Sequence, residues 1–407
     1  MIEINANIPR GPVFLAGETI ECHITFCNPA MDPNNPSHSN SDVCETLAWA
    51  SAQIHCQCSV DDNKVQIEQI PIHIQEEAAI SNEETSFAPC RGEIGHVAIA
   101  TQPKILFCDL RLLSGEKKSF IYKEVIPTEA PPTYRGFSVK YSYKITIGTQ
   151  RVNSAIKLLR VPIRILVLQG LMEILRNSDN EQQVSPSNPF FQEQEKESPL
   201  DMALQMLQNL TARKCPSQCK NILKSLKLFK NGFYNVTNNR GKVVRFCLFK
   251  NSFKLGEDIV GTFDFSQATV PCVQFSATLE SEEKINEERQ LQKQGYSKIR
   301  SYSKCHEYCL HMKKTHMVLP IPLNVCPAFS TDIASLSWKL HFEFVTTTTE
   351  LDDRTPPKSE KNNTTWTGPQ NLDIETMVWD LPIAIVPCNP VQVYFGLQLK
   401  NSIDINI

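Results

Sequence analysis

The sequence predicts an all-β protein made of two β-sandwiches in tandem, joined by a connector that is partly disordered and partly helical. Proline outnumbers glycine, 26 to 15 among 407 residues, which suits a protein with many rigid turns. Segments in which apolar and polar residues alternate, the pattern of half-buried strands, recur along the chain. A segment near the start is also repeated in the second half, so the sequence indicates an internal duplication.

The repeated segment covers residues 14–26 and, in its second copy, residues 253–265. Both copies begin with phenylalanine, continue with Gly-Glu and end in a strand pattern that closes on phenylalanine. Gly17 and Gly256 suit a turn that needs a positive φ, which glycine adopts at little cost. Each copy is therefore predicted to form a tight turn followed by a strand with one apolar face.

Two further pairs of strands follow in the same order in the two halves. Residues 141–147 and 338–344 both alternate apolar with polar side chains, as half-buried strands do. The last strand of each half carries a proline, Pro162 or Pro382, which predicts an edge strand or a bulge. Three pairs of matching strands that occur in the same order in both halves favour a duplication.

This repeat divides the chain into an N-terminal sandwich at residues 1–168, a connector at 169–222 and a C-terminal sandwich at 223–407. The connector is acidic first, with seven acids in 173–201, and basic later, with six lysines or arginines and no acid in 213–230. The basic part could touch anionic lipid or an acidic partner, although solvated lysines are the favoured interpretation.

Inside the connector, residues 179–198 have the polar composition of a disordered segment. Ser198 and Pro199 suit the N-cap and the first position of a short helix that follows. Long polar or charged insertions also interrupt the sandwiches, and they are expected to be functional or disordered loops. These insertions cover residues 28–42, 68–93, 281–304 and 346–363.

The charge is close to balanced, with 41 basic and 44 acidic residues, which argues against a nucleic-acid-binding protein. The first residues lack the basic end and apolar run of a secretory signal, so the fifteen cysteines are expected to be reduced thiols in a cytosolic protein. Most of them, including Cys56 and Cys58, are predicted to be buried. The longest apolar stretch, residues 161–171, is too short to span a bilayer.

Two tandem sandwiches, each with a Gly-Glu strand and a late strand that follows a proline-containing segment, resemble the arrestin fold. Within that superfamily, longer strings resemble the Rgp family of retrograde Golgi transport proteins. The strings run from Arg10-Gly-Pro-Val-Phe-Leu-Ala-Gly-Glu18 through residues 47–56, 103–112, 139–144, 151–154 and 240–243 to Thr364-Thr-Trp-Thr-Gly-Pro369. The resemblance extends from residue 2 to about residue 386 and therefore covers both sandwiches.

That family supplies the smaller subunit of a two-protein guanine-nucleotide exchange factor, whose larger partner, Ric-one, bears a β-propeller. The resemblance implies activation of a Golgi Rab GTPase of the Rab-six type and support for endosome-to-Golgi transport. It also implies a cytosolic pool that is recruited peripherally to Golgi membranes. The sequence contains no recognised enzyme motif. Gly241-Lys242, for example, lacks the remainder of a phosphate-binding loop. We therefore predict no catalytic, cofactor-binding or metal-binding residue, and partner contacts remain unassigned.

The best metal candidate is the group Cys305, Cys309 and His311, with Cys215 and Cys219 elsewhere in the chain. Zinc takes thiolate and imidazole ligands that converge tetrahedrally, and a Cys-x3-Cys spacing can supply two of them. The favoured alternative is a strand whose Tyr308 and Leu310 face the core.

Pro131-Pro132-Thr133-Tyr134 matches the PPxY pattern that WW domains bind as a polyproline helix. If this motif were exposed, the chain could act as an arrestin-type cargo adaptor or ubiquitin-ligase adaptor, which is the second functional hypothesis. The motif leads directly into the predicted strand at Tyr141, however. We therefore favour a packing role for Tyr134.

Overall fold

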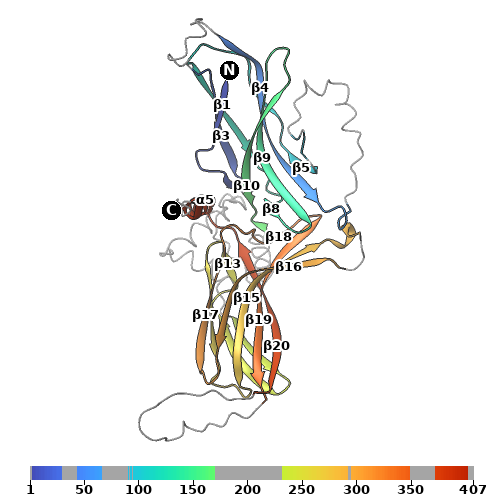
Figure 1. Cartoon of the computed structure of the whole chain (residues 1–407), viewed down its shortest axis with the longest axis vertical. Coiled ribbons are helices and arrows are strands. Elements are labelled where there is room, and N and C mark those ends of the chain that lie inside the picture. The colour runs from blue at the N-terminus through green and yellow to red at the C-terminus, as the bar shows by residue number, and fades with distance from the viewer. Residues whose placement is uncertain are drawn as a thin grey trace, which may run out of the picture.

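The computed structural model describes residues 2–29, 44–66, 90, 92–93, 95–169, 232–291, 295–348 and 372–401. Strands dominate these residues, so the all-β prediction is confirmed (Figure 1). The predicted helix after Ser198, the basic part of the connector, and the greater part of the insertions at 28–42, 68–93 and 346–363 lie outside the described residues. No described helix has the length and apolar character needed to cross a membrane.

The N-terminal sandwich consists of two sheets that face each other. Phe26, from the first sheet, packs edge-on against Phe107, from the second, with ring centroids 5.0 Å apart. The first sheet contains β1 (Glu3–Asn7), β3 (Thr19–Cys27) and β7 (Lys117–Val125) in that order. The second contains β2 (Val13–Leu15), β10 (Lys157–Leu166), β9 (Val139–Gln150), β4 (Glu45–Val60) and β5 (His96–Ala100), with β6 (Lys104–Leu112) on β4 and β8 (Tyr134–Arg135) on β9.

The C-terminal sandwich repeats this plan with an aromatic core. Phe263, from its first sheet, lies 4.2 Å from Phe275, from its second, between ring centroids. The first sheet contains β11 (Gly232–Asn238), β12 (Gly241–Leu248), β14 (Asp258–Asp264) and β17 (Lys314–Pro320). The second contains β13 (Ser252–Lys254), β20 (Ile374–Val386), β19 (Ala334–Thr347), β15 (Cys272–Ile285) and β16 (Ser297–Tyr308), with β18 (Phe329–Ser330) on β19.

The structure confirms the internal repeat through its strand pairing. β2 runs parallel to β10 with Phe14 opposite Ile165, and β13 runs parallel to β20 with Phe253 opposite Ile385. The apolar residues of the predicted alternating strands are buried in both halves, since Tyr143 in β9 and Phe342 in β19 are 1% and 0% exposed. Equivalent residues therefore occupy equivalent positions in the two sandwiches.

The two Gly-Glu turns are also built alike. Gly17 and Gly256 have φ angles of 92° and 79°, the left-handed region that favours glycine. The Glu18 carboxylate accepts a hydrogen bond from the backbone N–H three residues earlier at 2.7 Å, and Glu257 does the same at 2.9 Å. Each turn is thus closed by its own glutamate, which explains why Gly and Glu recur together.

Pro162 and Pro382 lie where one side of their strand has no partner strand among the described residues. β10 pairs with β9 along residues 157–163, but β2 joins its other side only from Arg164. Likewise β13 joins β20 only from Ala384. Proline cannot donate a ladder hydrogen bond, so it fits this locally unpaired edge, as the sequence predicts.

The expectation for residues 281–304 is wrong. Instead of an inserted loop, residues up to Ile285 extend β15 and residues from Ser297 extend β16, with a short 3₁₀ turn at Glu287–Arg289 between them. Figure 1 shows this hairpin running past the C-terminal sandwich towards the N-terminal one. Lys298, Arg300 and Lys304 are exposed, whereas the acids of β15 have polar partners, as where Ser297 Oγ donates to Glu282 at 2.6 Å.

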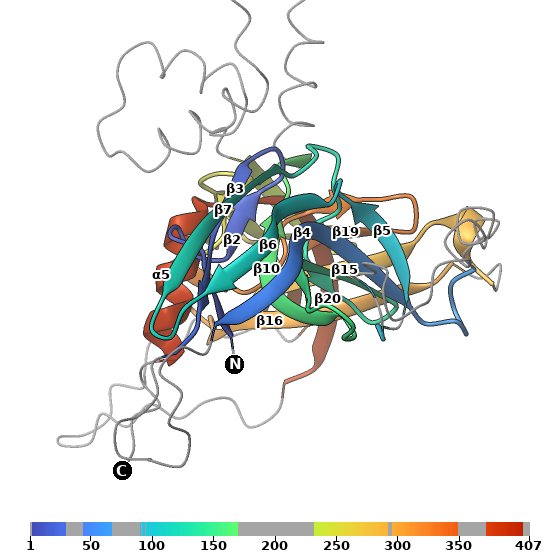
Figure 2. The ribbon, with the colours of Figure 1, turned by 90° about the horizontal axis from the view of Figure 1, so that it is seen from above.

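Helix α5 (Pro390–Asn401), which is not among the elements predicted from the sequence, ends the described chain. The Asn389 side chain accepts a hydrogen bond from the Val391 N–H at 3.0 Å, which makes it the N-cap, and Pro390 takes the first helical position. The helix contacts β2, and Figure 2 shows it along one side of the N-terminal strands. The last element of the C-terminal half therefore packs on the N-terminal half.

Candidate functional site at the domain junction

Glu283, near the end of β15, is buried between the two sandwiches with 2% of its surface exposed. Its carboxylate accepts three hydrogen bonds from the N-terminal sandwich: from the Tyr134 hydroxyl at 2.8 Å, the Phe137 N–H at 2.7 Å and the Ser138 N–H at 2.8 Å. A buried charge is costly unless it is paired or well hydrogen-bonded. Here the three donors satisfy the Glu283 carboxylate.

The donors come from the segment that contains the PPxY pattern. The Tyr134 ring packs edge-on against Phe329 of the C-terminal sandwich, with centroids 4.9 Å apart. Burial, reinforced by the negative charge of Glu283, raises the pKa of the Tyr134 hydroxyl, which keeps it in the protonated form that donates. A methyl group on Gly136 would overlap the Glu283 carboxylate. We call Tyr134, Gly136, Phe137, Ser138 and Glu283 the Glu283 socket.

Arg164 forms a second polar link across the junction. Its guanidinium donates to the carbonyl oxygens of Leu323 at 3.2 Å and Val325 at 2.8 Å. Burial lowers the pKa of this side chain, because desolvation penalises its charged form. The Tyr141 and Thr331 hydroxyls also meet across the junction at 3.1 Å.

The tip of the β15–β16 hairpin makes a third connection, through backbone groups. The Gln66 N–H donates to the Arg289 carbonyl at 2.8 Å, and the Leu291 N–H donates to the Lys64 carbonyl at 3.2 Å. The Lys64 ammonium also lies 5.3 Å from the centroid of the Tyr296 ring. These bonds add a short piece of β-ladder between the sandwiches, so the junction is held at several separate points.

Helix α5 adds an apolar contact that touches both halves. A side chain on Gly11 of the N-terminal sandwich would overlap the Tyr394 ring, so the two lie in close contact. Leu323 of the C-terminal sandwich is similarly close to Gly396. The helix thus packs across the junction.

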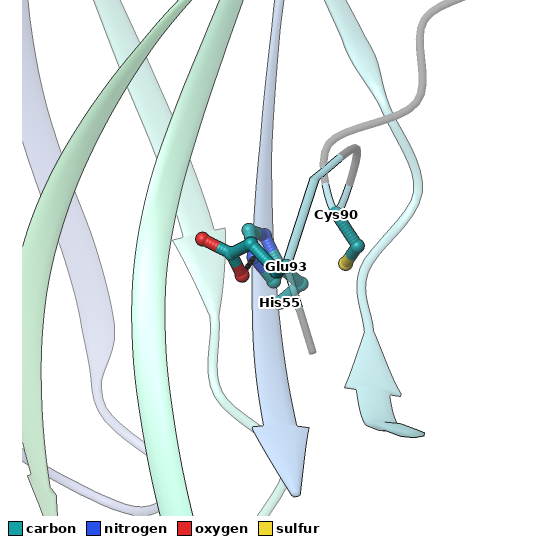
Figure 3. A group of neighbouring side chains, drawn as sticks. All are labelled: His55, Cys90 and Glu93. Atoms are coloured by element: carbon teal, nitrogen blue, oxygen red, sulfur yellow. Dashed lines mark hydrogen bonds and ion pairs between the residues drawn. The ribbon is translucent and has the colours of Figure 1, made fainter. Parts of the chain in front are cut away.

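His55, Cys90 and Glu93 form the one group in the described residues whose ligand atoms are close enough together to hold a metal ion (Figure 3). The Glu93 carboxylate is already paired with the Lys144 ammonium and lies 3.4 Å from Arg160 Nε. Burial raises the pKa of the Cys90 thiol, and the Glu93 charge adds to this, so the thiol is protonated. Lys144 and Arg160 already compensate the charge of Glu93, and the Cys90 thiol is neutral. The group therefore fits an ion cluster within the protein better than a metal site.

The residues predicted as a zinc candidate are not brought together. Cys305 lies on β16, His311 lies in the following turn with a φ of 64°, and Cys309 is buried beside Cys272. The predicted orientation of this strand is also wrong, since Tyr308 is 68% exposed whereas Cys309 faces the core. Cys215 and Cys219 lie outside the described residues.

Two other predictions concern buried side chains, and both agree with the structure. Cys56 and Cys58 are 0% and 2% exposed, and burial raises the pKa of their thiols to about 12 and about 11. Tyr134 packs in the junction, as its favoured interpretation predicts, and Pro132 beside it is buried. A WW domain could bind this motif only if the Glu283 socket opened.

The socket is not predicted from the sequence, because its donors and its acceptor lie far apart in the chain. The one available signal is the strand alternation around Glu283, which places this acid on the same face of β15 as the buried Ser281 and Ile285. An acid on an apolar face predicts a dedicated partner. Nothing in the sequence indicates that this partner is the segment around Gly136.

The comparisons with known proteins agree on one family. A family model described as Rgp1 matches residues 97–168 and 167–347. A Homo sapiens protein named RAB6A-GEF complex partner protein 2 is 45% identical over 416 aligned residues, which cover 100% of both chains. A Bos taurus protein of the same name is 44% identical and covers 94% of this chain and 93% of its own. The family predicted from strings such as residues 10–18 is confirmed, and the chain belongs to the Rgp1 family.

Proposed function

We propose that this chain is a subunit of a two-protein guanine-nucleotide exchange factor that activates a Rab GTPase of the Rab-six type. The observation that carries this proposal is the end-to-end match to relatives named RAB6A-GEF complex partner protein 2. Because the alignment covers both chains completely, it includes both sandwiches and the junction between them. The proposed role therefore belongs to the whole molecule.

The proposed mechanism is contact between proteins, without covalent chemistry. A GTPase retains GDP through phosphate and magnesium contacts and through the switch loops that these contacts order. An exchange complex stabilises the open, nucleotide-free state, and a ligand shifts such an equilibrium only by its differential affinity for the two states. The Glu283 socket supports this role because it holds the two sandwiches in one relative orientation, so that surfaces from both can contact a partner together.

The proposal extends to the partner and the location that the family resemblance implies. The second subunit is a β-propeller-bearing protein of the Ric-one type, and the two form a heterodimer. The complex acts on Golgi membranes, to which a cytosolic pool is recruited peripherally, and it supports transport from endosomes back to the Golgi.

GDP release from purified Rab GTPases tests the exchange activity. Fluorescent GDP is loaded on a Rab-six-type GTPase and on an unrelated Rab, and its release is followed with this chain, with the larger subunit and with both. We expect acceleration only with the mixture and only on the Rab-six-type GTPase. Equal release rates in all combinations would contradict the proposal, and acceleration by this chain alone would contradict the assignment of a shared activity.

A further inference from the structure

A groove of about 770 Å³ opens between the two sandwiches beside the Glu283 socket. Arg135 from β8 lines it on the N-terminal side, Arg300 and Tyr302 from β16 line it on the C-terminal side, and the segment 320–326 completes its wall. This volume has room for roughly 25 water molecules, so it far exceeds what a single inorganic anion would fill.

From its charge and shape we infer that this groove binds an extended acidic peptide segment of a partner protein. No aspartate or glutamate is among the described residues that line it, whereas two arginines are. A groove with two cations and no acid in its wall attracts carboxylates. The inference goes beyond the proposed exchange activity and does not depend on it.

The side chains of Arg135 and Arg300 are both exposed. Within the described part of the chain, neither Arg135 nor Arg300 pairs with a carboxylate. Arg300 stacks on the Phe137 ring, with its guanidinium carbon 4.7 Å from the ring centroid. Stacking uses the face of the guanidinium and leaves the N–H groups at its edge free, which is the geometry that binds a carboxylate in a bidentate manner.

A third guanidinium adds positive charge behind the groove. Arg164 donates to the carbonyls of Leu323 and Val325, which line the groove, and these neutral acceptors do not cancel its charge. Glu283, which Tyr134 contacts, adds one negative charge near the groove, because its three donors are neutral, but the three guanidinium groups outnumber it. The groove therefore has a net positive environment.

The remaining wall favours a peptide over a small anion. Pro320, Pro322 and Leu323 line the groove with exposed or partly exposed apolar surface, which suits side chains that alternate with acids along an extended segment. β16 is also the last strand of its sheet, so main-chain groups on its outer edge have no strand partner among the described residues. An extended peptide can pair with such an edge.

A fluorescein-labelled peptide of alternating glutamate and valine is a direct probe, measured by fluorescence anisotropy with the full chain. We expect binding that weakens as salt is raised, because the contacts are electrostatic. Arg135→Gln combined with Arg300→Gln should weaken binding about tenfold or more, since two charge-assisted contacts are lost. If the double variant folds poorly, Arg135→Gln alone should show a smaller loss of affinity in the same direction. This variant should fold, because the Arg135 side chain is exposed and pairs with no described carboxylate.

Arg245 provides a matched control, because its guanidinium carbon lies 4.8 Å above the Phe233 ring in the same stacked arrangement, away from the groove. Arg245→Gln should change the affinity by less than about twofold. A glutamine-valine peptide should not bind. Hydrogen exchange should show that the acidic peptide protects residues 320–326.

Several outcomes would overturn the inference. These are a failure of the acidic peptide to bind, equal affinity for the double variant, equal affinity for the glutamine-valine peptide, or protection only at other residues. Displacement of the peptide by an equal concentration of inorganic phosphate would reveal a simple anion site and would also overturn it.

Discussion

At the scale of single residues, Glu283 matters because it is a buried carboxylate whose partners are a phenol and two amides. The three donors belong to one sandwich and the acceptor belongs to the other. Removing the acceptor would leave donors unsatisfied on the opposite side, and an orphaned buried donor costs more than the hydrogen bond contributes.

Glu283→Ala is therefore expected to reduce the free energy of unfolding by about 3 kcal/mol, since three buried donors lose their acceptor. Denaturant-induced unfolding of the variant and of the wild type measures this difference in the free energy of unfolding. Glu282→Ala is the control, because the Glu282 side chain is partly exposed and pairs with the exposed Lys284, and it should cost less than about 1 kcal/mol. Similar losses for the two variants would contradict the structural role of Glu283.

Gly136→Ala should also destabilise the junction, because its new methyl group would overlap the Glu283 carboxylate and the Tyr134 ring. We expect a loss of about 1–3 kcal/mol, as for other overpacked sites. A side chain on Gly295 would meet no atom within 4 Å, so Gly295→Ala is the matched control and should be close to neutral. Thermal unfolding of the two variants compares them directly, and equal melting temperatures would count against the close contact.

The ion cluster around His55 predicts a dependence of stability on pH. Burial lowers the pKa of His55 from 6.5, an effect that the Glu93 carboxylate only partly offsets and that Lys144 and Arg160 reinforce. As the pH falls through about 6.5, the unfolded chain binds a proton that the folded chain does not. Acidification thus favours the unfolded chain, and the free energy of unfolding should decrease between about pH 7.5 and about pH 5.5.

His55→Gln should make this decrease shallower, whereas the same change at the exposed His96 should leave it as in the wild type. Urea midpoints at the two pH values give the comparison. An unchanged slope in His55→Gln would show that another group causes the pH dependence. Protonation of Glu93 at lower pH should also reduce the free energy of unfolding, because its pKa is lowered in the folded chain. Burial alone would raise its pKa, but the hydrogen bonds from Lys144 and His55 and the charge of Arg160 lower it overall.

At the scale of elements, the β15–β16 hairpin connects the sandwiches through backbone hydrogen bonds at its tip. Leu291→Pro removes the N–H that donates to Lys64, whereas Leu291→Ala keeps it. We expect amide exchange at Gln66 to accelerate about tenfold in the proline variant, because the local ladder opens. Amides of the sandwich cores should be unaffected, and acceleration in the alanine variant would implicate the lost side chain instead.

Strand alternation and the Gly-Glu repeat were enough to predict the three repeated pairs of strands from sequence, because burial of one face imposes a period of two. The hairpin was misinterpreted because residues 281–304 are highly charged, and charge alone does not distinguish a solvated loop from strands whose acids have partners. Helix α5 was missed although Asn389-Pro390 is a start signal. Val391, Val393 and Phe395 alternate with polar or aromatic residues, which imitates a strand.

The donors of the Glu283 socket could not have been predicted, because strand alternation marks Glu283 as a buried acid but long-range pairing leaves no local pattern that identifies its partners. Tyr134 illustrates the limit. Its position before a strand favoured packing, but the sequence does not reveal that the partners of this side chain are Glu283 and Phe329. The arginines of the groove pose the same problem, since Arg135 and Arg300 become neighbours of one cavity only when the sandwiches are assembled.

At the scale of the whole molecule, the contacts at the junction predict that the two sandwiches unfold together. Calorimetry of the wild-type chain should show one transition whose calorimetric and van't Hoff enthalpies agree. In Glu283→Ala the transition should broaden or split, because the coupling between the sandwiches is weakened, while Glu282→Ala should retain a single transition. Two well-separated transitions in the wild type would show that the junction does not couple them.

The Gly-Glu turns are built alike in the two halves, which is the mark of a duplicated gene segment whose copies could once have served as separate modules. The Glu283 socket has since divided one polar group between them, with the acceptor encoded in the second copy and the donors in the first. A nonsense mutation or a splice variant that keeps one sandwich would leave the other half of the socket exposed and unsatisfied.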